Sequence, residues 1–119
     1  MAHRQDPSEV PPPRNHHYLM LLALLAGDAH GLAIAREVER LSEGRVRLWP
    51  ATLYGSLDEL SDRGWIRELD GQRPPGESAR KHFYRITDLG REAAQAETRR
   101  LAELLKVARS RVKPRGETA

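Results

Sequence analysis

The sequence contains no cysteine, which excludes disulfide bridges and metal sites built from thiolates. Five histidines are present, but no two of them stand four residues apart, the spacing that places two imidazoles on one side of a helix as metal ligands. We therefore expect neither a metal ion nor another cofactor.

Long apolar runs are also missing, since the longest one, residues 18–26, is well short of the ~20 residues that span a bilayer. The N-terminus lacks the pattern of a signal peptide. Both absences predict a cytoplasmic protein that does not enter a membrane.

The residue sets that enzymes need are absent as well. Acid–base or nucleophilic catalysis requires convergent Ser, His and Asp side chains, paired carboxylates or a bound metal. His30 and His82 are expected in a turn and at a strand start with no nucleophile nearby, and no phosphate-binding glycine loop occurs. We therefore predict that the chain is not an enzyme.

The length and the charge of the chain indicate a small, mildly basic domain. It has 119 residues, a net charge of +3 and a pI of about 9.7. A core of this size is marginal, so association of two chains would add stability. The basic balance is compatible with a polyanionic partner. Residues 1–14 are rich in proline and poor in apolar side chains, and we predict disordered tails there and at residues 113–119.

The most informative stretch is residues 49–66, which predicts a helix with one buried side. Pro50 suits its first turn, and Gly64 suits its end. An apolar stripe with i, i+4 and i+7 spacing is formed by Leu53, Leu57 and Leu60.

The opposite side of this helix carries small and hydroxylic residues in its first two turns. These are Ala51, Thr52, Gly55 and Ser56, with Glu59 at the edge. Such a face fits closely against another molecule, and the major groove of DNA admits one α-helix. The alternative is a short helix with a plain surface.

Two further helices are predicted before this one, at residues 15–26 and 32–41. The first begins with His16 and His17, which we expect to be exposed, and is then apolar on every side. Such a helix must pack against neighbours on more than one side. We therefore expect a second subunit to contact it through Leu21 and Leu25. Packing within a single domain is the alternative.

Strands are predicted before and after the helix in residues 49–66. Alternating residues at 45–48 predict a very short strand, and residues 65–69 and 81–87 predict a hairpin around a loop rich in glycine and proline. The loop end of the hairpin carries the basic residues Arg73, Arg80 and Lys81. Three helices followed by a two-stranded wing form the winged-helix layout, whose second and third helices are a helix-turn-helix.

The last predicted helix, residues 88–112, has the apolar spacing of a coiled coil. Its apolar positions, with Thr98 filling one gap, are Ala94, Leu101, Leu105, Ala108 and Val112. We favour a contact between two subunits along this seam, because the helix at residues 15–26 also needs a second surface to pack against. Packing on its own domain is the alternative.

The expected fold is therefore mainly α within the α+β class. It is a winged helix-turn-helix over residues 15–87 with a two- to three-stranded wing, followed by a long C-terminal dimerisation helix at residues 88–112.

Three motifs, in this order, resemble the PadR family of transcriptional regulators. They are the apolar run 21–26 followed by His30-Gly31, the segment 52–60 followed by residues 64–66, and the segment 83–91. The resemblance covers roughly residues 15–92 and implies a homodimeric winged-helix repressor of the short subfamily, which has a single dimerisation helix.

The resemblance also implies an effector, because phenolic acids or hydrophobic drugs relieve repression in that family. We therefore expect a small hydrophobic or phenolic ligand. Some short members bind flat drugs between aromatic residues at the dimer centre. The last helix here has no aromatic residue, and Trp49 and Trp65 lie in the winged-helix unit, which argues against such a stacking pocket.

The candidate DNA-binding residues fall into two groups. Phosphate contacts are expected from Arg45, Arg47, Arg73, Arg80, Lys81 and the hydroxyl of Tyr54. Base contacts are expected from Thr52, Gly55, Ser56 and Glu59. The helix has no Arg, Asn or Gln in its first two turns, so specificity is expected to depend partly on DNA shape or on the wing. The alternatives are a Tyr54 that packs in the core and a basic loop that is only solvated.

A winged-helix module that binds proteins instead of DNA is the alternative function. Asp58 and Asp62 on the central helix favour it, because carboxylates repel phosphates. The partners we expect are a double-stranded DNA operator and a second copy of the chain.

Overall fold

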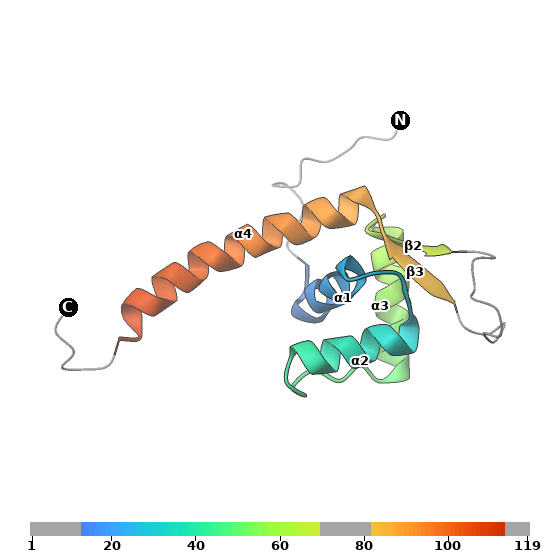
Figure 1. The fold of residues 1–119 in the computed structure, drawn as a ribbon, viewed down its shortest axis with the longest axis horizontal. Helices are drawn as coiled ribbons and strands as arrows, with labels where there is room; N and C mark the ends of the chain where they lie inside the picture. Colours follow the sequence, from blue (N-terminus) through green and yellow to red (C-terminus); the bar gives the residue numbers. More distant parts are fainter. Residues whose placement is uncertain (1–12, 70–81, 114–119) are drawn as a thin grey trace.

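The structure, a computed structural model, describes residues 13–69 and 82–113 of the chain. A small globular unit holds three helices and a sheet, and a fourth helix extends away from it (Figure 1). In chain order the elements are α1 (Asn15–Leu25), β1 (Ala29–His30), α2 (Gly31–Leu41), α3 (Pro50–Asp62), β2 (Ile66–Leu69), β3 (Phe83–Ile86) and α4 (Asp88–Arg111). This is the predicted winged helix-turn-helix with a long C-terminal helix. Within the described residues, no helix is long and apolar enough to cross a membrane.

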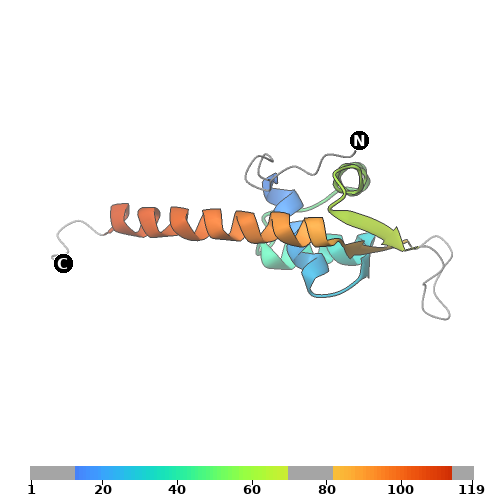
Figure 2. The same cartoon turned by 90° about the horizontal axis from the view of Figure 1, so that it is seen from above.

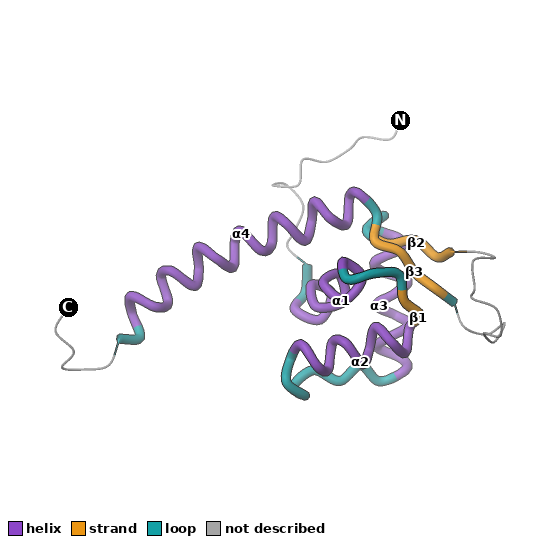
Figure 3. The backbone as a smooth tube through the Cα atoms, viewed as in Figure 1, coloured by secondary structure: helices purple, strands orange, loops and turns teal. Residues whose placement is uncertain are grey.

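The sheet is antiparallel, and β3 lies between β1 and β2 (Figure 3). Its third strand is Ala29–His30, so the strand predicted at residues 45–48 is wrong. The backbone of residues 45–48 forms a local hydrogen bond instead, in which the N–H of Val46 donates to Ser42 Oγ at 2.9 Å. Val46 and Leu48 pack against the core from an irregular loop, which explains their alternation without a strand.

The core lies between the helices and one face of the sheet. The stripe predicted on α3 is confirmed, because its three leucines are buried. Other fully buried side chains come from α1, α2 and the strands and include Met20, Leu21, Leu24, Ile34, Val38 and Ile66. The apolar circumference of α1 is thus covered mainly by α2, β3 and α4 of the same chain.

The start of α1 departs from expectation. His17 is fully buried and His16 is half-buried, so the prediction that both are exposed is wrong. The reason is the position of α3, which packs beside the first turn of α1 and places Ser56 within 3.1 Å of His16 Nε2.

α4 begins at a well-defined cap. The hydroxyl of Thr87 accepts the N–H of Gly90 and donates to the carbonyl of Gly64. Gly90 is required here, because a Cβ at that position would stand 2.0 Å from the carbonyl oxygen of Trp65. This close approach fixes the direction in which α4 leaves the sheet.

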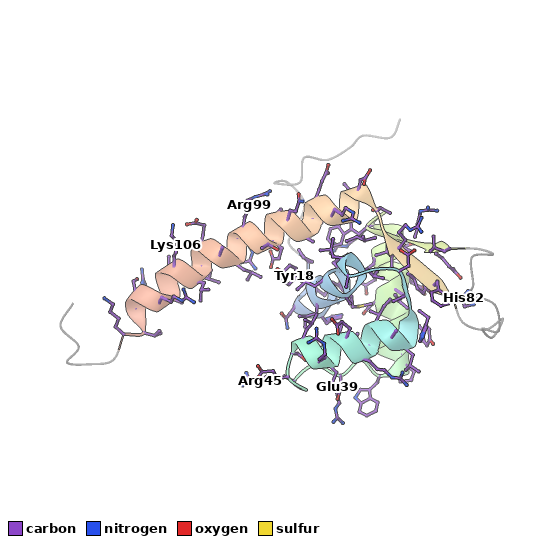
Figure 4. The ribbon with its side chains drawn as sticks, in the orientation of Figure 1. Tyr18, Glu39, Arg45, His82, Arg99 and Lys106 are labelled. Carbon is purple, nitrogen blue, oxygen red and sulfur yellow. The ribbon has the colours of Figure 1, made fainter. Side chains whose placement is uncertain are left out.

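The two halves of α4 have different surroundings. The first half packs across α1, where Ala94 is buried and Thr98 Oγ1 lies 2.8 Å from the hydroxyl of Tyr18. The second half extends beyond the globular unit (Figure 2). The apolar residues that continue the side of Ala94, here named the distal stripe, are Leu101, Leu104, Leu105, Ala108 and Val112. Arg99 and Lys106 lie on the side of α4 turned away from α1 (Figure 4).

Candidate nucleic-acid interface

The helix-turn-helix is formed by α2 and α3, which meet at the start of α2. His30 caps α2, because its Nδ1 accepts the N–H of Ala33 at 3.2 Å. Gly31 follows and faces α3, where a Cβ would stand 3.4 Å from Leu57 and 3.6 Å from the ring of Tyr54. The small residue lets the two helices approach closely, so that α3 keeps one side in the core and the other in solvent.

The exposed side of α3 is smooth in its first two turns. A Cβ placed on Gly55 would meet no atom within 4 Å, and Thr52 on the preceding turn is exposed as well. Glu59 lies one turn further along and is about half exposed. Another molecule can therefore approach the backbone of α3 at Gly55 without meeting a side chain.

Ser56 differs from its predicted place. It is buried and interacts with His16, because a residue three positions from Leu53 and four from Leu60 lies beside the apolar stripe. A buried Ser56 is therefore not available for contact with a base edge.

Tyr54 lies on the solvent side of the contact between α2 and α3. Its side chain is 56% exposed although its ring rests near Gly31. In the part of the chain that the structure describes, its hydroxyl makes no hydrogen bond. The geometry thus favours an outward-reaching phenol over a core tyrosine bonded to its own chain.

The basic residues of the connecting loop do not all lie beside α3. Arg47 forms an ion pair with Glu39 at 2.9 Å. Arg45 lies near the C-terminal end of α2, remote from the sheet and from the first turn of α3 (Figure 4). Any phosphate bound by Arg45 would therefore flank the groove in which α3 lies.

The wing is anchored at its base by ion pairs. Arg85 on β3 binds Asp28 at 2.7 Å, and hydrogen bonding by this guanidinium holds the pKa of Asp28 below its usual value. His82 pairs with Glu68 across the hairpin (Figure 4). The predicted basic residues of the loop, Arg73, Arg80 and Lys81, lie outside the described residues.

Trp49 is an interface candidate that the sequence analysis did not include. It is the N-cap of α3, its indole is 67% exposed, and its side chain makes no capping bond. The signal in the sequence was an aromatic residue directly before a helix-initiating proline, where Ser, Thr, Asp or Asn is usual.

The described residues offer no metal centre, because residues 13–69 and 82–113 contain no group of three or more His, Asp or Glu side chains that could hold an ion. The features that the described residues offer are an α3 face without long side chains over its first two turns and an exposed Tyr54 phenol beside it.

The pattern of the transcriptional regulator PadR-like family matches residues 20–96, which is more than half of the chain. The chain belongs to the PadR-like family of transcriptional regulators. The resemblance seen in the sequence is therefore confirmed. Members of this family act as transcriptional regulators and not as enzymes.

Solved structures share the fold of this PadR-like regulator. A transcriptional regulator from Clostridium thermocellum matches with a TM-score of 0.67 and 24% identity, covering 82% of this chain and 90% of that one. A PadR family transcription regulator from Clostridium difficile matches with a TM-score of 0.70 and 18% identity, covering 84% and 100%. PcaV from Streptomyces coelicolor, solved with its natural ligand, matches with a TM-score of 0.67 and 20% identity, covering 85% and 64%.

A relative is also found among curated sequences. The 37.1 kDa protein in transposon TN4556 of Streptomyces fradiae is 35% identical over 86 residues, which are 72% of this chain. The match spans 23% of that protein, so this chain covers less than a quarter of its length.

Proposed function

We propose that two copies of this PadR-like regulator associate through α4, bind a pseudo-palindromic DNA operator and repress transcription. The observation that carries DNA docking is the open surface over Gly55, where α3 presents its backbone to solvent. A recognition helix must lie deep in the major groove, and side chains longer than those of this face would hold it away.

The charges on α3 favour one orientation in the groove. Asp58 and Asp62 are both exposed and belong to its C-terminal half. Because carboxylates repel phosphates, the N-terminal half enters the groove and the C-terminal half tilts outward. Thr52 and Gly55 then face base edges and Glu59 lies at the margin of the contact, where α3 leaves the groove, while Trp49 and Tyr54 lie near the DNA backbone.

Phosphate contacts supply most of the affinity in this proposal. Arg47 must exchange Glu39 for a phosphate, and Arg45 binds further along the same strand. The basic wing residues Arg73, Arg80 and Lys81 add contacts outside the groove occupied by α3. Each phosphate neutralised releases counterions, so affinity must fall steeply with salt.

The distal stripe supports association of two chains. Leu104 and Leu105 are each about half exposed and Val112 is 76% exposed, although all three continue the side of α4 that packs on α1. A second α4 would cover this side. Leu21 is buried inside its own domain and is left out of the proposed contact, whereas Leu25 is partly exposed and remains in it.

A two-fold dimer predicts the form of the operator. Two α3 helices related by such an axis read half-sites about 10 bp apart, or a multiple of that spacing. Bound over a promoter, the dimer would block the polymerase. A small hydrophobic or phenolic effector would relieve this block; the support is the ligand-bound structure of PcaV, which shares the fold.

The experiment is a selection of duplexes from a random 30-bp library by the purified full chain, followed by binding titrations at several salt concentrations. We expect an enriched sequence with two-fold symmetry and an affinity that drops by about 10³ or more between 50 and 200 mM salt. Recovery of no enriched sequence, with no binding even at low salt, would contradict the proposal.

Gly55→Arg tests the docking face. The long side chain should block close approach and weaken operator binding, while the melting temperature and the oligomeric state stay unchanged. The matched control is Gln95→Arg, which adds the same charge at an exposed position of α4 and should leave operator binding intact. Equal affinities of the two variants would show that the docking face is wrong.

The protein-binding module is the second candidate, favoured by exposed Asp58 and Asp62. It predicts weak DNA binding without sequence preference, because a protein partner does not require the symmetric site. The same selection therefore separates the two functions.

A further inference from the structure

The first turn of α1 makes polar contacts with the edge of α3. His16 Nε2 lies 3.1 Å from Ser56 Oγ, and Ser56 is itself buried. His17, the next residue, is fully buried, and its Nε2 lies 3.9 Å from Oε2 of Glu59. Ser56 and Glu59 stand directly beside Gly55 on the helix, so this contact fixes the edge of the proposed DNA-binding face.

The ring of His17 is buried without a hydrogen-bond partner among the described residues. Neither of its nitrogens makes a hydrogen bond within residues 13–69 and 82–113, and the carboxylate oxygen of Glu59, at 3.9 Å, is beyond hydrogen-bonding distance. Leaving a ring nitrogen unsatisfied in the core is unfavourable, and an apolar side chain of similar size would pack there without that cost. What an imidazole adds at this position is the ability to take up a proton.

Burial and the neighbouring cations together oppose protonation of the two rings, against the influence of Glu59. Burial lowers the pKa of His17 to about 4, with further lowering by His16, Arg14 and Arg63, while Glu59 acts in the opposite direction. Burial also lowers the pKa of His16, again helped by Arg14 and opposed by Glu59. Both rings are therefore neutral at pH 7.

We propose that His16 and His17 are positioning residues for α3, and that they hold it in its DNA-binding orientation only while the buried ring of His17 is neutral. Acid would then release the contact between α1 and α3 and weaken operator binding. This inference rests on the proposed function for its DNA readout, but the contact between α1 and α3 can be measured without DNA.

The size of the acid response follows from proton linkage. When the contact opens, His17 returns to its ordinary pKa of 6.5, whereas in the closed state it stays near 4. His17 therefore takes up a proton at a higher pH in the open state than in the closed state. Lowering the pH from 7 to 5 shifts the closed–open equilibrium by roughly 20-fold toward the open state.

The first test compares operator affinity at pH 7 and pH 5 in the full chain and in His17→Leu, at constant salt, using the duplex enriched by the selection. The unmodified chain should lose at least about tenfold more affinity than His17→Leu, whose buried side chain cannot titrate. The control His82→Gln removes a histidine near the hairpin and should keep the full acid response. Identical pH profiles for the chain and His17→Leu would overturn the proposal.

Folding of the variant is checked by thermal melting at pH 7, where His17→Leu should melt at or above the temperature of the unmodified chain. If leucine does not fit, His17→Phe provides a second non-titrating ring at the same place. An unchanged acid response in whichever variant folds would likewise overturn the proposal.

The second test addresses the bond between His16 and Ser56. His16→Ala should weaken operator binding, and His16→Gln should restore it, because the glutamine amide can replace the ring as a hydrogen-bond partner. In the double variant with Ser56→Ala the losses should be strongly non-additive. Additive losses, or a failure of glutamine to restore binding, would contradict a positioning role for His16.

An NMR titration of the free protein separates this inference from the proposed function. The backbone amides of Ser56 and Glu59 should shift with the same midpoint as the His17 ring. If they shift together but no duplex binds at pH 7, the proposed function fails and the positioning contact stands. If the ring titrates while these amides stay fixed, the positioning role is overturned.

Discussion

The two halves of α4 carry one continuous pattern but have different surroundings. Ala94 in the first half is 1% exposed against α1, whereas Leu104 in the second half is 53% exposed. Both belong to the same side of the helix, and the apolar spacing continues from one to the other with Thr98 filling one gap. Helical periodicity therefore shows which side of a helix is buried but not whether its own chain or a second chain covers that side.

The largest effect is expected from Ala94→Asp in the first half. This change places a charge in the contact between α4 and α1 with no partner, and the expected loss of unfolding free energy is about 3–5 kcal/mol. Chemical denaturation of the purified protein measures it. A loss below about 1 kcal/mol would show that α4 is not part of the folded unit.

The double variant Leu104→Asp/Leu105→Asp tests the second half. We expect the dissociation constant of the dimer to rise by at least about 100-fold, because two apolar contacts are replaced by four carboxylates across the two-fold axis. Sedimentation measures the dissociation constant, and circular dichroism should show that the winged-helix unit remains folded.

The control for this variant is Arg99→Asp, which adds negative charge on the side of α4 turned away from α1. It should leave the dimer intact. If both variants dissociate equally, the contact between subunits does not depend on the distal stripe.

Thr98→Val probes the position where the two halves meet. The variant keeps the shape of the side chain but loses the hydrogen bond with the Tyr18 hydroxyl, and we expect a loss of about 1 kcal/mol in unfolding free energy. Tyr18→Phe should cost a similar amount. The two losses should not add in the double variant, and additive losses would show that the two hydroxyls do not interact.

The smallest effect is expected from Lys106→Gln on the outer side of the second half. Its ion pair with Glu103 spans 3.9 Å between two exposed side chains, so unfolding free energy should change by less than about 0.5 kcal/mol. Dimer affinity should also stay unchanged. A large loss of dimer affinity would place the outer side of α4 in the subunit contact.

Much of the fold was accessible from the sequence because its signals are local. The leucine stripe of α3, the proline at its start and the long helix after Thr87 each follow from helical spacing and capping. The third strand was missed because a two-residue strand has no periodicity, and Ala29–His30 joins the sheet through backbone bonds alone.

The candidate site was less predictable because it depends on tertiary neighbours. Spacing placed Ser56 on the small-residue face, but the first turn of α1 covers it, and no local pattern shows where that turn will lie. The same packing buries His17, whose sequence position at a helix start suggested exposure. The open surface at Gly55, in contrast, follows directly from its place opposite the leucines.

Two chains joined through the distal stripe are expected to present two α3 helices to one operator. The most direct measurement is the mass of the particle in solution, alone and on the selected duplex, by analytical ultracentrifugation at micromolar protein. We expect two 13.5 kDa chains per particle in both cases, with one dimer per duplex. A protein that stays monomeric in solution and binds as one chain per duplex would contradict this arrangement.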